Sequence, residues 1–154
     1  MNMKRVFFIF LLIYSIYGCN NDEPTVVRID EWFTIGLSEK VKIIDDRNHA
    51  LFISLVDITE NRCPSDAFCV QAGDVLIKVI IEDTRNSQYS TLLCLGDCSP
   101  SITNMKSFVF YNIEYTIDLK EVNPFPTTHN HEEKRTAVIK IFRNWVIINK
   151  FDVP

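Results

Sequence analysis

Short runs of alternating apolar and polar residues constrain the fold of this chain more than any other feature. The clearest run spans residues 75–82, where every second residue from Val75 to Ile81 is a valine or an isoleucine. Alternate side chains of a strand point to opposite faces, so this run predicts a strand with one buried face. A period of two recurs from Arg28 onward, and no stretch sustains the 3.6-residue period of a helix.

Nine short strands are predicted on this criterion, with turn-forming residues between them. They span residues 31–35, 40–44, 50–58, 75–82, 88–95, 107–111, 114–122, 136–142 and 145–151. The last two are expected to form a hairpin across Arg143 and Asn144. Closely spaced short strands predict an all-β fold, a single antiparallel β-sandwich or barrel of about eight or nine strands. We expect residues 28–154 to form this one domain.

Residues 1–18 have the features of a secretory signal peptide. Lys4 and Arg5 form a short basic start, and the apolar run that follows ends at Tyr17. This run is shorter than the roughly 20 apolar residues that a membrane-spanning helix needs, and it fits the apolar region of a signal. Gly18 directly precedes Cys19, which resembles the lipobox of bacterial lipoproteins, where the cysteine after the cleavage site becomes lipid-modified. The alternative is an ordinary cleaved signal, with Cys19 left as an unpaired thiol.

The residues after the cleavage site predict a surface-exposed anchor. Residues 19–27 would form a lipidated cysteine and a polar tether, and the acidic stretch 20–23 is similar to the export tags of Bacteroidota-type lipoproteins. We therefore expect a location at the bacterial outer membrane, lipid-anchored through Cys19 and facing the cell surface. Without Lys4 and Arg5, 14 basic residues face 20 acidic ones, a formal charge of −6. Nucleic acids attract basic surfaces, so no nucleic-acid partner is expected.

Four further cysteines can pair in three ways. Because an exported protein meets oxidising surroundings, we expect disulfides. Pairing of neighbours, Cys63 with Cys69 and Cys94 with Cys98, is favoured because each pair brackets a turn; the crossed pairings stay geometrically possible. The alternative is a four-cysteine zinc site. Zinc motifs favour two to four residues between paired ligands, whereas Cys63 and Cys69 have five between them.

The stretch from Arg62 to Gly73, RCPSDAFCVQAG, resembles a motif of small uncharacterised secreted proteins and lipoproteins of Bacteroidota-type bacteria. There the motif usually runs Asp-Ser-Arg-Cys-Pro, a short gap, Cys, one residue, Trp-Ala-Gly and then a strand. This chain departs from it at Glu60 and Asn61, and at Gln71 in place of Trp. The resemblance implies a β domain with a Cys63–Cys69 disulfide and implies no activity. From the residues alone, we expect Arg62 to bond a carboxylate or carbonyl near the loop.

One run resembles a set of metal ligands. His129 and His131 lie two residues apart and are followed by two glutamates, so on an extended chain both imidazoles would point the same way. A solvated loop explains the same composition equally well, and we expect no metal and no cofactor. No serine lies in a Gly-x-Ser-x-Gly turn, and no catalytic residue is predicted. His49 stands alone among turn residues and is expected to be exposed.

These features favour a surface-anchored lipoprotein whose β domain binds or scaffolds and does not catalyse. Loops on a rigid scaffold commonly carry recognition, so a protein partner would use loops 63–73 and 124–134, the latter with Phe125 exposed. An inhibitor of secreted proteases is one concrete version. Two alternatives are a metal-dependent hydrolase that uses His129 and His131, and an assembly factor that faces the periplasm.

The intact mass of the protein extracted from its own membranes tests the predicted processing. We expect the mass of residues 19–154 plus lipid on Cys19, with the other four cysteines oxidised and no bound metal. A mass without lipid would contradict the anchor, and four free thiols or a bound metal would contradict the predicted disulfides.

Overall fold

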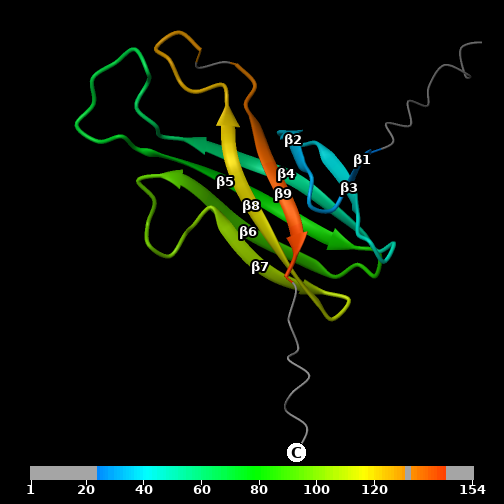
Figure 1. Ribbon diagram of the computed structural model, residues 1–154. Coiled ribbons are helices and arrows are strands. Elements are labelled where there is room, and N and C mark those ends of the chain that lie inside the picture. The colour runs from blue at the N-terminus through cyan, green and yellow to red at the C-terminus, as the bar shows by residue number, and fades with distance from the viewer. Residues whose placement is uncertain (1–23, 131–132, 145–154) are drawn as a thin grey trace, which may run out of the picture.

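The computed structural model describes residues 24–130 and 133–144. Cys19, His131 and the strand expected at 145–151 lie outside the described residues. The described chain forms nine strands, which are labelled in Figure 1. They are β1 (Thr25–Arg28), β2 (Trp32–Gly36), β3 (Lys40–Ile44), β4 (Ala50–Glu60), β5 (Asp74–Asp83), β6 (Gln88–Gly96), β7 (Met105–Phe110), β8 (Ile113–Asn123) and β9 (Thr136–Arg143). Among these residues, no helix is long and apolar enough to cross a membrane.

The strands form two packed sheets. One sheet has five strands in the order β1-β3-β4-β5-β6, and the other has four in the order β2-β9-β8-β7. The all-β prediction is confirmed, and of the two architectures named, the structure is a sandwich and not a closed barrel. All neighbouring strands are antiparallel except β1 and β3, which pair in parallel. Regular pairing begins at Thr25, three residues before the expected start of the domain.

The inward faces of both sheets form one continuous apolar core. Every second residue of β5 from Val75 to Ile81 is fully buried, as its alternation predicts. Tyr115, Ile117 and Leu119 of β8 cover this layer from the opposite sheet. The predicted pairing of residues 107–111 with 114–122 is confirmed as the β7–β8 hairpin. β9 pairs with β2 on one side and with β8 on the other, and the hairpin expected beyond Arg143 lies outside the described residues.

A buried hydrogen bond connects the two sheets at the end where the β3–β4 turn lies. The Tyr115 hydroxyl donates to Asp45 Oδ2 at 2.8 Å, and Nδ1 of His49 lies 3.0 Å from the same oxygen. Burial opposes ionisation of Asp45, but the hydrogen bonds from the His49 backbone, Tyr115, the His49 ring and the Arg47 backbone lower its pKa overall. Burial and the hydrogen bond to Asp45 raise the pKa of Tyr115.

His49 is held in this cluster, so the expectation that it lies exposed is wrong. Its side chain is about one-third accessible, and its ring stacks on Tyr111 with centroids 4.5 Å apart. Tyr111 in turn donates from its hydroxyl to the Ala50 carbonyl. The sequence-based expectation treated the Asp45–His49 cluster as a local turn. It could not foresee that the β7–β8 turn supplies Tyr111 to this cluster and that β8 supplies Tyr115.

We predict that Tyr115→Phe destabilises the domain by about 1–2 kcal/mol, because the buried Asp45 carboxylate loses a hydrogen bond with little change in packing volume. Urea unfolding measures the difference. Tyr89→Phe is the matched control, since Tyr89 is a partly buried core tyrosine whose hydroxyl makes no hydrogen bond within the described residues. Equal effects of the two substitutions would contradict the role assigned to the Tyr115–Asp45 bond.

Candidate functional site

Two β-bulges change the direction of the side chains at the end of the sandwich where the candidate loops lie. In β4 the register shifts between Leu55 and Asp57, and in β8 it shifts between Leu119 and Glu121. A bulge adds one residue to one strand of a pair, so the residues after it reverse the face to which they point. Beyond the first bulge, Glu60 lies opposite the buried Val75, and its carboxylate therefore points toward the inside of the sandwich.

The Glu60 carboxylate binds two arginines, and all three side chains are largely buried. Arg62 donates from Nε to Oε1 at 2.7 Å and from Nη2 to Oε2 at 2.6 Å, and Arg135 Nε donates to Oε2 at 3.0 Å. The three side chains are only 10–13% exposed. Burial alone would raise the pKa of Glu60, but the hydrogen bonds and charge of Arg62 and the charge of Arg135 lower it below its ordinary value. The expectation that Arg62 bonds a nearby carboxylate is confirmed.

Arg62 also connects the β4–β5 loop to the β8–β9 loop. Its Nη2 donates to the Val122 carbonyl at 3.1 Å, and its guanidinium lies 4.3 Å from the centre of the Phe125 ring. Phe125 is about half exposed, in line with its expected exposure, but one face of its ring is covered by this cation–π contact. A single arginine thus contacts both loops.

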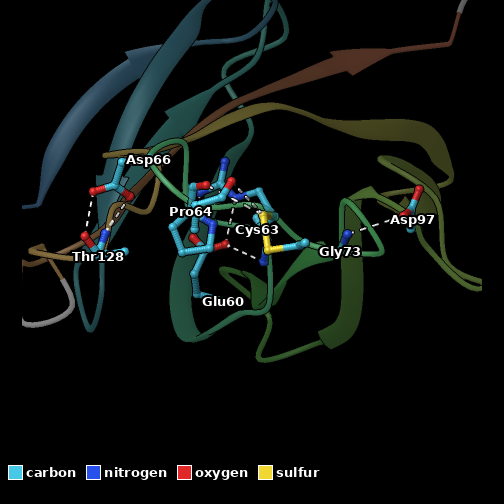
Figure 2. The surroundings of a disulfide bond; sticks show 10 residues. Glu60, Cys63, Pro64, Asp66, Gly73, Asp97 and Thr128 are labelled. Atoms are coloured by element: carbon cyan, nitrogen blue, oxygen red, sulfur yellow. Dashed lines mark hydrogen bonds and ion pairs between the residues drawn. A yellow bond between two sulfur atoms is a disulfide. The ribbon is translucent and has the colours of Figure 1, made fainter.

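The four cysteines form the two predicted disulfides, Cys63–Cys69 and Cys94–Cys98, so they do not form a four-cysteine zinc site. The first encloses a short loop, and the Cys63 amide donates to the Ala72 carbonyl at 2.7 Å across its base. Figure 2 shows this disulfide among its neighbours.

Gly73 joins the first disulfide loop to the second. The Gly73 carbonyl accepts from the Asp97 amide at 2.9 Å. The Gly73 amide donates to Asp97 Oδ2 at 3.3 Å, as Figure 2 shows. Gly73 has a φ of +74°, and a Cβ there would overlap the Asn61 carbonyl. Only glycine fits this bend without strain.

The two loops expected to contact a partner lie side by side and are bonded to each other. Asp66 accepts from the Thr128 amide at 2.8 Å and from its hydroxyl at 2.6 Å, as the left side of Figure 2 shows. The Ser65 amide donates to the Pro126 carbonyl at 2.9 Å. These hydrogen bonds from Thr128 lower the pKa of Asp66. We call residues 61–73 together with 124–130 the paired-loop platform, which is visible at the upper left of Figure 1.

The outer part of the β4–β5 loop is exposed. All eight residues 65–72 lie at the surface. Phe68 and Val70 flank Cys69, and their relative exposures are 109% and 104%, which means that neither side chain packs against the domain. Within the described residues, the backbone groups of Phe68 to Gln71 make no hydrogen bond. We refer to residues 65–72 as the tip of the platform.

The histidine pair proposed as metal ligands is described only in part. His129 is exposed on the β8–β9 loop, where its amide donates to Thr127 Oγ1, and His131 lies outside the described residues. Residues 24–130 and 133–144 contain no group of three or more His, Cys, Asp or Glu side chains placed to hold a metal ion.

The sequence reasoning missed the parts of this site that depend on long-range contacts. Arg135 and the Asp66–Thr128 bond join segments about 60 to 75 residues apart, which no local pattern reveals. Phe68 and Val70 carried a usable signal, since two large apolar residues flank a cysteine in a loop otherwise made of small and polar residues.

Comparisons with models of known protein families, with curated proteins and with solved structures found no match for this chain.

The Glu60 network predicts a specific pH dependence. Since the pKa of Glu60 is lowered by folding, its contribution to stability is complete above the ordinary pKa of 4.5 and is lost as the pH falls through the lower folded value. Glu60→Gln should lower the free energy of unfolding by about 1–3 kcal/mol at pH 6, and this difference between wild type and variant should decrease toward pH 3. Urea unfolding of both proteins at several pH values measures this difference. A difference that stays constant with pH would contradict the lowered pKa of Glu60.

Proposed function

We propose that this chain is a surface-anchored, non-catalytic binding module that contacts a protein partner with the tip of its paired-loop platform. The observation that carries the proposal is the full exposure of Phe68 and Val70 on a loop fixed at its base. Each side chain leaves apolar area in water that burial against a partner would remove, at roughly 25 cal/mol per Å². Large apolar anchors at the centre of an interface commonly supply most of its binding energy.

The rigidity of the platform supports binding. Flexible loops lose conformational entropy when a partner orders them, and a loop that is already fixed loses less. Here the disulfide, the Cys63–Ala72 bond and the Asp66–Thr128 bonds hold the chain on both sides of Phe68. The carboxylates at the platform are engaged in holding its loops together, because both oxygens of Asp66 and both oxygens of Glu60, which directly precedes the platform, accept hydrogen bonds. This use of the charges favours binding over catalysis.

Disulfides are maintained in oxidising compartments, so the protein is extracytoplasmic. We further propose that it is anchored in the outer membrane through lipid on Cys19, with the domain facing the cell surface. The signal-like residues 1–18, the small residue before Cys19 and the acidic stretch 20–23 support this location. Protease treatment of intact cells distinguishes it from the periplasm-facing alternative, in which the domain would be protected until the membrane is broken.

A photo-crosslinking amino acid placed at Gln71 in the tip tests the binding function in living cells. We expect it to join the chain to one discrete protein, and we expect Phe68→Ser combined with Val70→Ser to reduce that product by about tenfold or more. The double variant should unfold at nearly the same temperature as wild type, because neither side chain packs against the domain.

The control places the same crosslinker at Val109, an apolar residue of β7 that is 63% exposed and far in sequence from the tip. It should not produce the tip-specific product. The same products from both positions, or a product that survives the double substitution, would refute a partner site at the tip.

A further inference from the structure

The tip has the backbone properties of a protease substrate held in a fixed shape. A protease binds its substrate as an extended strand and needs free backbone amide and carbonyl groups to pair with its own. Phe68 to Gln71 offer such groups, because their backbone makes no hydrogen bond within the described residues. The eight exposed residues 65–72 leave both sides of the Phe68–Cys69 peptide bond accessible.

The two sides of the Phe68–Cys69 peptide bond are anchored independently of each other. On the amino-terminal side, Ser65 bonds Pro126 and Asp66 bonds Thr128 of the β8–β9 loop. On the carboxyl-terminal side, the disulfide ties Cys69 to Cys63, whose amide bonds the Ala72 carbonyl. Cleavage of this one bond would therefore release neither new end from the platform.

We propose that the tip is a substrate-like inhibitory loop for secreted serine proteases that have an apolar primary pocket, with Phe68 as the residue that enters the pocket. This inference rests on the proposed binding function and names the class of partner. A large aromatic side chain that is fully exposed suits an apolar pocket, and the fixed loop would bind with little loss of entropy.

The chemistry explains why such a loop inhibits and is not consumed. The protease serine adds to the Phe68 carbonyl carbon while its proton passes to the catalytic histidine. The bond to the Cys69 nitrogen then breaks, and that nitrogen takes the proton. The new amine stays beside the acyl-enzyme because the disulfide holds Cys69. At such a high effective concentration it attacks the acyl carbon, reforms the peptide bond and returns the proton to the serine faster than water completes hydrolysis.

A lipid surface is a less suitable occupant of the same tip. Unpaired backbone groups are costly to bury in hydrocarbon, where no water satisfies them, and Phe68 to Gln71 would carry theirs into the membrane. A protease cleft would pair them. The carboxylates of Asp66 and Asp97 at the platform also disfavour an anionic lipid surface.

The test measures inhibition of purified chymotrypsin and trypsin by the folded, disulfide-bonded domain. We expect wild type to inhibit chymotrypsin and not trypsin. Phe68→Arg should weaken chymotrypsin inhibition by about 100-fold or more and create trypsin inhibition, because the residue in the primary pocket sets specificity. Val109→Arg is the control for an added charge and should behave as wild type. Mass spectrometry of long incubations should find cleavage, where it occurs, at Phe68–Cys69 alone.

A second pair of variants tests the anchoring. Cys63→Ser combined with Cys69→Ser should turn the inhibitor into an ordinary substrate that is cut at residue 68 and released. Wild type that is cut to completion without inhibiting, or Phe68→Arg that gains no trypsin inhibition, would overturn the proposal. So would tip-dependent flotation with phosphatidylethanolamine and phosphatidylglycerol vesicles in the absence of inhibition. If inhibition fails while the crosslink from Gln71 persists, the inhibitory role is refuted and the binding function stands. If neither inhibition nor the crosslink is observed, both proposals are refuted.

Discussion

The Glu60 carboxylate is the point on which the geometry of the paired-loop platform depends. It lies at the end of β4 and binds Arg62, directly before the disulfide loop, and Arg135, directly before β9, so it joins the two sheets and orders the chain on either side. Removing three charged groups from water has a large desolvation cost, which their mutual attraction offsets only when the geometry is well defined. Compared with apolar residues of the same shape, such a network adds little net stability, whereas removal of one partner is costly because it leaves a buried charge uncompensated. We regard it as the device that fixes where the tip points.

The disulfides act locally around this network. Loops this short lose little entropy on closure, and each bond contributes on the order of 2 kcal/mol in the chain-entropy model. The buried faces of the two sheets supply the stability of the domain, as a single cluster of twenty buried apolar residues within the described part of the chain indicates. The Cys63–Cys69 bond instead sets the shape of the tip, and the Cys94–Cys98 loop supports it through Asp97 and Gly73. The stability of the domain and the proposed binding function thus depend on different parts of the molecule.

Alternation in the sequence predicted most of the strands because one face of each must be buried. It predicted β5 and its buried valines and isoleucines closely. The spacing of the cysteines around turns separately predicted both disulfides. Alternation missed β1, since four residues after a polar stretch carry too little pattern. Alternation also missed both bulges, although β4 carries a signal of the first. The core-facing apolar residues of β4 have odd numbers up to Leu55, and the next one is Ile58. The Glu60 network and the contact between the loops could not be predicted, because they join segments that only the tertiary fold brings together.

Amide hydrogen exchange across residues 61–73 and 124–130, resolved by NMR, tests the central claim that a rigid platform presents a free tip. The amides of Cys63, Ser65 and Thr128 donate hydrogen bonds that hold the platform, and they should exchange slowly. Those of Phe68 to Gln71 make no such bonds to residues 24–130 or 133–144 and should exchange close to the rate of an unstructured peptide. Uniformly fast exchange over both loops would contradict the rigid platform, and protection at Phe68 to Gln71 would contradict the free tip.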